Sequence, residues 1–445
     1  MDRFVKWFRN STPYINAHRG KTFVVCFGGE AVMSADFPHL VQDLTLLASL
    51  GVRLVLVHGV APQLAERLDR ASLDLAYHGE IPVLTAAALE CVKDAVGTAR
   101  LDIEAGFSCG LPQTPMDGAA LRLLSGNFLI ARPVGVRNGV DHQHSGEIRR
   151  LETPAIRQAL HQGAVVLLSP MGYSTTGEAF FLQSEAVATQ AAIQLGADKL
   201  IFLEEVVEVV EAMAPNRPGQ MDPAQAEAQL AATDFVPERR PAWEGCVQAC
   251  RSGVPRAHLI PRQQEGALLL ELFTRDGIGT LITAGQYDVL REATIDDIGG
   301  LLALIAPLET QGILVHRSRE QLELEIGNFI VMERDQAILA CAALYGFIEE
   351  DVGEIACIAV HPDYRELGLG QDLLTHLEQR AWARGLRRLF VLTTQTAHWF
   401  IEQGYRPGRI QDLPVARQGL YNYKRNSKVF IKTLEAAPAA RSATA

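Results

Sequence analysis

The sequence predicts an α/β protein built from two successive domains, each with its own sheet. In the first part of the chain, apolar β-rich runs alternate with helical stretches, a pattern typical of a largely parallel sheet covered by helices. This block ends around residues 283–288, and a second block then begins with the helical period of REATIDDIGGLLALIA. A chain of 445 residues is long enough to give each domain a core.

The elements of the first domain follow from these runs. Residues 1–20 carry aromatic and basic side chains and predict a leading helix that serves as an interface. The predicted strands are 22–27, 53–58, 164–169 and 199–204, and the predicted helices are 36–50, 85–105 and 185–196. The Pro- and Gly-rich stretch 214–225 predicts a surface loop. We therefore expect residues 21–285 to form the first domain.

The second domain is expected over residues 288–435. After its first helix come predicted strands 328–333, 337–345 and 353–360, a helix over 368–384 and a strand over 388–394. The last residues, 436–445, have nothing to bury and are expected to be disordered.

Composition limits the class of ligand. A net charge of −11 disfavours a general attraction to nucleic acid or to acidic membranes, so small molecules are the expected partners. The start of the chain lacks the apolar segment of a signal peptide, and no apolar run reaches the length of a membrane helix, so we expect a cytoplasmic protein. The seven cysteines form no disulfide framework, and the pair His142 and His144 lacks further ligands, so no metal site is predicted.

One motif stands out in the second domain. In CIAVHPDYRELGLGQDLL, an apolar strand leads through Arg365-x-x-Gly368-x-Gly370 into a helix. Glycines allow close approach to the backbone, and the first amides of a helix point toward an anion, so this turn predicts a pyrophosphate site. Neither the dinucleotide-binding G-x-G-x-x-G nor the ATP-binding P-loop pattern is present.

This R-x-x-G-x-G turn resembles that of the GNAT acetyltransferases, which implies a GNAT α/β domain and acetyl-CoA as co-substrate. The residues expected at the cofactor are Cys357, Ile358, Val360, Arg365, Leu367, Gly368, Leu369 and Gly370. The backbone amides of Ile358 and Val360 are expected to hold the pantetheine arm.

The first domain resembles the amino-acid kinase family, especially the arginine-sensitive acetylglutamate kinases, over roughly residues 14–285. Two glycine turns carry the likeness, VVCFGGEAVM and VHGVAPQL. Cys26 replaces the family's lysine, the second turn reads His58-Gly-Val-Ala instead of HGGG, and Glu185 stands in a segment that normally supplies aspartate. Phosphoryl transfer depends on positioned cations and dipoles, so we predict no kinase activity.

The stretch LLLELFTRDGIGT, residues 268–280, resembles the arginine-binding segment of the inhibited members. The resemblance implies an L-arginine site formed by Glu271, Gly277 and Gly279, closed by Tyr14, with Lys199 toward the carboxylate. It also implies that the leading helix joins subunits into a homo-hexamer. An ordinary helix and turn at the end of a domain is the simpler alternative.

Together, the two domains in this order resemble the bacterial N-acetylglutamate synthases, as do the segments 131–150 and 392–405. This resemblance implies transfer of an acetyl group from acetyl-CoA to L-glutamate, the first step of arginine biosynthesis, with feedback inhibition by arginine. A dicarboxylate needs fixed cations, preferably the planar fork of arginine. The residues expected at the substrate are Leu314, Arg317, Cys357, Thr393 and Arg425.

The reaction needs a general base for the ammonium of glutamate, and Glu354 is the candidate for that catalytic role. A covalent route through Cys357 is the less favoured alternative. The tyrosine that many GNAT domains use as acid is replaced by Ile401, so the acid stays unassigned.

Three rival functions remain open at this stage. They are a bifunctional synthase and kinase, an acetyltransferase with another acceptor, and a non-catalytic arginine sensor.

Overall fold

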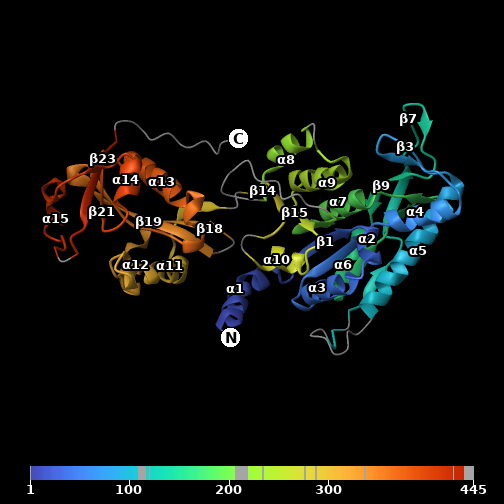
Figure 1. Cartoon of the computed structure of the whole chain (residues 1–445), viewed down its shortest axis with the longest axis horizontal. Helices are drawn as coiled ribbons and strands as arrows, with labels where there is room; N and C mark the ends of the chain where they lie inside the picture. Colours follow the sequence, from blue (N-terminus) through green and yellow to red (C-terminus); the bar gives the residue numbers. More distant parts are fainter. Residues whose placement is uncertain are drawn as a thin grey trace. The chain divides into compact units, whose positions relative to one another are not determined.

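The computed structural model describes residues 2–434 except 109–116, 120, 206–218, 233–234, 275–276, 286–287, 335–336 and 424. The chain forms two compact units, residues 1–285 and residues 286–445. Each unit contains its own sheet with helices on both faces (Figure 1). The predicted α/β class is confirmed.

The first unit is built on an eight-stranded sheet in the order β14-β16-β15-β13-β1-β2-β10-β5. Its strands are β1 Thr22–Phe27, β2 Arg53–His58, β5 Leu123–Ser125, β10 Val165–Leu168, β13 Lys199–Glu204, β14 Gln220–Met221, β15 Arg256–Pro261 and β16 Thr280–Thr283. Every pair is parallel except β15 with β16. The central strands are apolar throughout because helices bury both of their faces.

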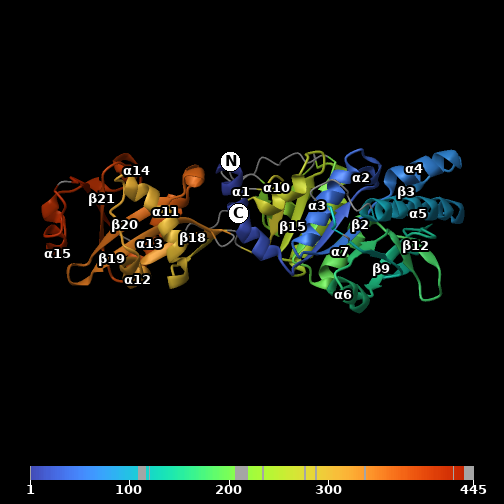
Figure 2. The same ribbon diagram turned by 90° about the horizontal axis from the view of Figure 1, so that it is seen from below.

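Two hydrophobic clusters fill the space between this sheet and its helices. One face is covered by α1 Asp2–His18, α3 Phe37–Ser49, α5 Ala86–Ser108 and α10 Ala267–Phe273, and the other by α6 Thr153–His161, α7 Ser184–Leu195, α8 Pro223–Leu230 and α9 Arg240–Arg251. Seen from below, α3 and α10 lie over the sheet (Figure 2). The unit is therefore a helix–sheet–helix sandwich.

Smaller elements complete the first unit. They are α2 Gly29–Met33, α4 Ala61–Arg70, the hairpin strands β3 Ala76–His78 and β4 Ile81–Val83, the short strands β7 Val136–Arg137 and β8 Val140–Asp141, and a four-stranded sheet of β12 Ala179–Phe181, β11 Met171–Tyr173, β6 Leu129–Pro133 and β9 Gly146–Leu151. A further apolar cluster joins α4 and α5 to β11 and β12.

The prediction of a loop over residues 214–225 is wrong for its last part. Residues up to 218 lie outside the described part of the chain, but the remainder forms β14 and starts α8. The Asp222 side chain accepts hydrogen bonds from the amides of Ala224 and Gln225, both at 2.8 Å. Pro223 occupies the first helical turn, where its missing N–H costs nothing. The proline that suggested a loop therefore begins a helix.

The second unit contains a seven-stranded sheet in the order β17-β18-β19-β20-β21-β23-β22. Its strands are β17 Val289–Glu292, β18 Phe329–Arg334, β19 Ala337–Phe347, β20 Val352–Val360, β21 Arg388–Thr393, β22 Arg406–Pro407 and β23 Lys428–Thr433. Helices α11 Ile298–Thr310 and α12 Arg319–Glu325 pack on one face, and α13 Leu369–Ala383 and α14 Ala397–Glu402 on the other. The tail expected to be disordered, 436–445, lies outside the described residues.

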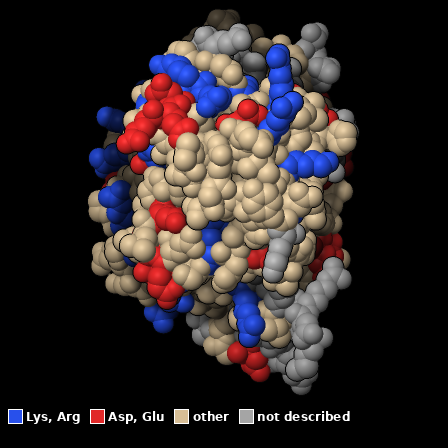
Figure 3. Space-filling model, turned by 90° about the vertical axis from the view of Figure 1, so that its left-hand side faces the viewer, with Lys and Arg blue, Asp and Glu red and all other residues tan. Residues whose placement is uncertain are grey.

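Figure 3 shows one face of the molecule, the end where α15 Val415–Gln418 lies in Figure 1. Acidic and basic side chains are interspersed around a broad uncharged centre. Val415, Leu420 and Tyr423, in and beside α15, are largely exposed. This face therefore carries no field of a single sign.

Among the described residues, no helix is both long and apolar enough to cross a membrane.

Candidate functional site

The second unit has an opening between two neighbouring parallel strands. Strand β20 pairs with β21 from Val352 to Ile355, opposite Arg388 to Val391. Beyond Ile355, β20 runs on to Val360 and β21 to Thr393, with no further pairing between the two. One edge of β20 is therefore left without a strand partner over its last five residues.

A β-bulge marks the start of this unpaired edge. Ala343 of β19 faces Ala356, while Cys341 faces Ala359, so Cys357 and Ile358 together oppose a single residue. Cys357 adopts φ of 53°, a left-handed conformation that a residue with a side chain seldom takes. Bulges of this kind bend a strand and re-aim its side chains, and they concentrate near functional sites.

A backbone hydrogen bond just after β20 shows which amides face the opening. The amide of His361 donates to the carbonyl of Leu339 in β19, at 2.8 Å. Because successive amides of a strand point to opposite sides, those of Ile358 and Val360 point away from β19 and into the opening. Two hydrogen-bond donors are thus available at the positions predicted from the sequence.

The predicted anion-binding turn follows directly. A short 3₁₀ turn, Pro362–Leu367, leads to Gly368, which has φ of 73° and caps the N-terminus of α13. No described atom lies within 4 Å of the position that a Cβ on Gly368 would occupy. Arg365 is exposed, whereas the side chain of Leu369 is fully buried. Leu369 can therefore contribute only through its backbone.

Two arginines distant in sequence come together in the same unit. Arg425 donates to the carbonyl of Ile313, and its buried Nε has no hydrogen-bond partner among the described residues. Burial lowers the pKa of Arg425, and the nearby positive charge of Arg317 lowers it further. The positive charges of these two guanidinium groups act on one another, and one group has a donor without a partner among the described residues, an arrangement that suits an anion with two carboxylates.

Arg317 lies beside the bulge. Burial alone would lower the pKa of Arg317, but its neighbours Cys357, Tyr345 and Glu325 raise that pKa above the ordinary value. The pKa of the Cys357 thiol is lowered, first by a hydrogen bond with Cys341 and also by the charge of Arg317. The charge of Arg317 therefore acts on the Cys357 thiol at the bulge.

Glu354, the candidate base, is buried on β20 and paired in a way that the sequence did not predict. Arg417 donates from Nε to Oε2 at 2.7 Å and from Nη2 to Oε1 at 2.9 Å. Both carboxylate oxygens are therefore occupied by a bidentate ion pair. Arg417 follows no recognisable motif, so sequence reasoning gave no signal for it.

Thr393 ends β21 at the far side of the opening. Its Oγ1 accepts the amides of Gln395 and Thr396 and lies 2.8 Å from the Thr396 hydroxyl. Tyr405 is buried and donates to Glu378 at 3.1 Å. Thr393 thus borders the opening, whereas the Tyr405 hydroxyl is used in its bond to Glu378.

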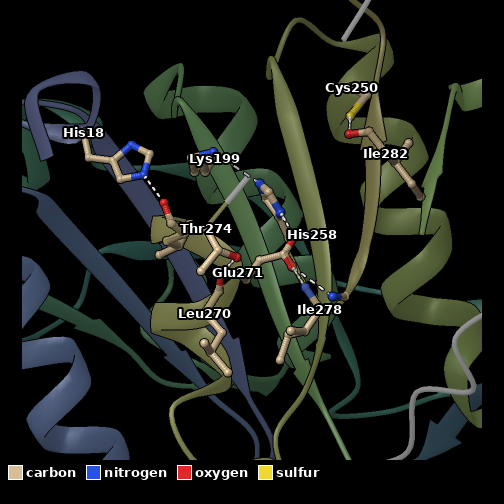
Figure 4. A network of polar contacts seen from close by, with 11 residues as sticks. His18, Lys199, Cys250, His258, Leu270, Glu271, Thr274, Ile278 and Ile282 are labelled. Carbon is tan, nitrogen blue, oxygen red and sulfur yellow. Dashed lines mark hydrogen bonds and ion pairs between the residues drawn. The ribbon is translucent and has the colours of Figure 1, made fainter. Parts of the chain in front are cut away.

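A polar network in the first unit joins three of the residues predicted to bind arginine (Figure 4). Glu271 accepts from His258 Nδ1 at 2.7 Å and from the amides of Ile278 and Gly279 at 2.7 and 2.9 Å. Lys199 Nζ lies 3.3 Å from His258 Nε2. Because an ammonium only donates, Nε2 must accept, so Nδ1 carries the proton that His258 donates to Glu271.

The charges of this network are set by burial and by its partners. Burial alone would raise the pKa of Glu271, but His258 and the two amides lower it to about 2. Burial and the charge of Lys199 lower the pKa of His258 to about 4. A Cβ on Gly277 would collide with Glu271, so glycine is required there. The sequence did not point to His258, because a histidine within an apolar strand looks like a core residue.

Helix α1 packs against the same region. His18 Nε2 bonds the carbonyl of Leu272 at 2.8 Å, and Tyr14 lies next to His18, with ring centroids 6.4 Å apart. Phe8, six residues before Tyr14 in the same helix, is 55% exposed. The structure therefore brings Tyr14 to the helix that carries Glu271. The side chains of Phe4 and Trp7 lie outside the described residues.

The two kinase-like turns lie at the ends of β1 and β2 and are closely packed. Gln63 donates to the carbonyl of Gly29 at 2.8 Å and occupies the space that a Cβ there would need. A Cβ on Gly59 would lie 3.3 Å from the Cα of Gly28 and from the amide nitrogen of Gly29, so the second turn packs against the backbone of the first. The Ser184 hydroxyl, which bonds Glu185, lies nearby. Burial raises the pKa values of Cys26 and Glu185. Cys26 therefore supplies no positive charge at the position where the kinases carry a lysine for the transferring phosphate.

Comparisons with known proteins agree with this geometry. Residues 21–260 match the amino acid kinase family and residues 302–405 the GNAT acetyltransferase family. The amino-acid acetyltransferases of Azotobacter vinelandii and Ectopseudomonas mendocina are 52% and 51% identical over 436 and 443 residues, which is 98% of this chain and 100% of each relative. The crystal structure of N-acetylglutamate synthase from Neisseria gonorrhoeae, complexed with coenzyme A and L-arginine, matches with a TM-score of 0.86 and 35% identity, covering 97% of this chain and 100% of that one.

These features define a GNAT acyltransferase that carries an amino-acid kinase fold. The chain belongs to the amino-acid acetyltransferases, the N-acetylglutamate synthase family. The predicted family and enzyme class are confirmed, and the enzyme uses acetyl-CoA as GNAT enzymes do.

Proposed function

We propose that this enzyme transfers the acetyl group of acetyl-CoA to the amine of L-glutamate, giving N-acetyl-L-glutamate and coenzyme A. The observation that carries the proposal is the buried Nε of Arg425, which has no hydrogen-bond partner among the described residues, in a region where the charge of Arg317 adds to its own. A dicarboxylate supplies the acceptors that these guanidinium groups require. The same Neisseria enzyme has also been crystallised with coenzyme A and N-acetyl-glutamate, and that structure matches this chain with a TM-score of 0.59 and 36% identity.

In this proposal the cofactor is held mainly by the backbone. Its pyrophosphate binds at the N-terminus of α13, over Leu367, Gly368, Leu369 and Gly370, with Arg365 adding a positive charge. Its pantetheine arm bonds the amides of Ile358 and Val360 in the opening between β20 and β21. The thioester then lies beside Cys357.

The acceptor carboxylates bind Arg317 and Arg425, with Leu314 and the backbone of Cys357 completing the pocket. Glu354 removes a proton from the ammonium, directly or through water, and the free amine attacks the thioester carbon. The C–S bond then breaks and coenzyme A leaves as a thiolate, with Thr393 available for hydrogen bonding. The thiolate takes the second proton that the nitrogen loses as the amide forms. Since Arg417 occupies both oxygens of Glu354, one of those bonds must loosen as the proton arrives.

We propose that L-arginine inhibits by binding the kinase-like domain at Glu271, Gly277, Gly279, Lys199 and Tyr14. The buried network around Glu271 supports this assignment, since it places a carboxylate next to α1. The exposed Phe8 of α1 supports a role of residues 1–20 in joining subunits, and we propose a homo-hexamer working in the cytoplasm.

The decisive experiment is a steady-state assay of acetyl-CoA with a panel of amino acids, with and without arginine. We expect L-glutamate to have by far the highest kcat/KM, and arginine to inhibit. A preference for another amino acid would overturn the substrate assignment. A coupled ADP-release assay with ATP and N-acetylglutamate should give no turnover, and measurable turnover would restore the bifunctional alternative.

A further inference from the structure

Leu314 and Arg317, two of the residues proposed to bind the acceptor, lie in the segment that joins α11 to α12. Gly312 adopts φ of 72°, a left-handed conformation that is common just after the end of a helix. Ser318 caps the N-terminus of α12 with its hydroxyl. Residues 312–318 therefore form a short loop with a defined start and end, which we call the 312–318 loop.

One buried carboxylate holds the far part of this loop. Glu309, in the last turn of α11, accepts from the amide of Arg317 with Oε1 and from Nδ1 of His316 with Oε2, both at 2.9 Å. The side chain of Glu309 is only 8% exposed, whereas that of His316 is 81% exposed. Both carboxylate oxygens are thus used by two successive residues of the loop, and the chain at Arg317 is held against the end of α11.

The same loop also fixes the two arginines proposed to bind the acceptor. Arg425 donates from Nη2 to the carbonyl of Ile313, and Arg317 donates from Nη1 to the carbonyl of Val315 at 3.1 Å. Each guanidinium is therefore bonded to a carbonyl of the loop. A change in the path of the loop would move both groups, because these carbonyls would move with it.

A carboxylate is a costly group to place here. Burying its charge is unfavourable unless hydrogen bonds compensate for the lost water, and a negative charge near the loop also opposes the binding of an anion. The bonds from Arg317 and His316 supply the compensation. The contacts of Glu309 are thus directed to the loop and leave neither oxygen for a substrate.

We propose that Glu309 is a positioning residue that holds the 312–318 loop in the conformation from which Arg317 and Arg425 bind the carboxylates of the acceptor. Glu309 does not touch the reacting atoms and acts through the loop. This inference rests on the proposed use of an anionic amino-acid acceptor. It adds a residue of α11 to those that determine acceptor binding.

The test is Glu309→Ala, which removes both hydrogen bonds to the loop. We expect KM for L-glutamate to rise about tenfold, with kcat and KM for acetyl-CoA changed less than about twofold, because bonds to a charged group are lost only from the loop that binds the acceptor. Glu309→Asp keeps the charge but shortens the side chain, and it should raise the same KM. An unchanged KM for L-glutamate in Glu309→Ala would overturn the proposal. If that variant does not fold, the same result in Glu309→Asp would overturn it.

Glu309→Gln separates the hydrogen bonds from the charge. Its amide oxygen can still accept from the Arg317 amide, so KM for L-glutamate should stay within about threefold of the wild-type value. If KM instead falls below the wild-type value in both Glu309→Gln and Glu309→Ala, the carboxylate only repels the acceptor and the proposal is wrong. The matched control is Glu323→Ala, which removes an exposed carboxylate of α12 that is paired with Arg319. It should leave KM for L-glutamate unchanged.

A double-mutant cycle distinguishes positioning of the guanidinium from a general loss of structure. If Glu309 acts in part by placing Arg317, Glu309→Ala should raise KM for L-glutamate clearly less in an Arg317→Ala background than it does alone. Full additivity of the two changes would contradict the proposal.

Failure of this inference is distinguishable from failure of the proposed function. If the wild-type enzyme prefers another amino acid with two carboxylates, only the assignment of glutamate fails, and the same variants are assayed with that acceptor. If it prefers an acceptor without a second carboxylate, the substrate assignment and this inference both fail. If it acetylates glutamate and Glu309→Ala has the wild-type KM, only the role of Glu309 is rejected.

Discussion

The kinase-like unit and the GNAT unit both place glycine-containing turns after buried strands, yet the two kinds of turn differ in what fills them. After β1, the Gln63 side chain occupies the space beside Gly29, and after β2, the backbone of the first turn lies close to Gly59. After β20, the position beside Gly368 is open to at least 4 Å among the described atoms. A glycine motif therefore indicates that the backbone can be approached, but only its neighbours determine whether a ligand can approach it.

The charges of the two candidate sites differ as well. In the GNAT unit, Arg317 and Arg425 carry positive charges that act on one another, and the buried Nε of Arg425 has no hydrogen-bond partner among the described residues. In the kinase-like unit, burial raises the pKa values of Cys26 and Glu185 and so favours their neutral forms. This contrast supports the proposal that acetyl transfer takes place in the second unit and that the first has a regulatory role.

The largest expected effect is that of Glu354→Gln. Loss of a general base should lower kcat by a factor of about 10²–10⁴, most severely at low pH, with KM for acetyl-CoA little changed. The measurement is a pH–rate profile.

Arg417→Gln is the matched control for Glu354, because it frees the carboxylate without removing it. If Glu354 is the base, this variant keeps a carboxylate-dependent rate. Equal losses in the two variants would instead make Glu354 a structural partner of Arg417.

Arg425→Ala should be the next most damaging change. It removes a half-buried guanidinium from the proposed acceptor site, and kcat/KM for L-glutamate should fall roughly 100-fold. KM for acetyl-CoA should stay within about twofold. Arg406→Ala, at an exposed arginine of β22, is the control and should behave as wild type. A mild Arg425 variant would weaken the comparison between the two units, because the unpaired donor would have no function.

Glu271→Ala tests the regulatory role of the first unit. We expect the arginine concentration for half-inhibition to rise at least about tenfold while basal synthesis is retained. Glu265→Ala, at the exposed residue shortly before α10, should leave inhibition intact. Full arginine sensitivity in Glu271→Ala would show that the effector site is elsewhere.

The smallest expected effect is on stability. Burial, with a smaller effect from Lys199, lowers the pKa of His18 to about 4 from an ordinary 6.5. Between these values the unfolded chain binds the proton and the folded chain does not, so stability falls as pH decreases from 7 to 5, by about 1–2 kcal/mol for this group. Urea unfolding at both pH values measures it.

His18→Gln should reduce this pH dependence, whereas His39→Gln, at an exposed histidine, should not. An unchanged pH dependence in His18→Gln would remove His18 as the cause.

The sequence predicted the strands well because their signals are local. The apolar run of β20 and the glycines after it lie within one short segment, and Arg317 and Arg425 matched a family pattern. Arg417 and His258 were missed because their roles come from partners distant along the chain. Glu354 and Arg417, for example, are 63 residues apart. The helix α8 was missed because Pro223 marks either a loop or a first helical turn, and the cap at Asp222 decides between them.

The divergence of β20 from β21 has a consequence for how this enzyme tolerates variation. In the proposed mode, main-chain amides bind the acetyl donor, and most side-chain replacements leave that binding unchanged, since every residue except proline supplies the same N–H. The choice of acetyl acceptor depends instead on a few guanidinium groups, each of which a single codon change can remove. Random mutation should therefore alter which amine is acetylated far more readily than it abolishes the use of the thioester.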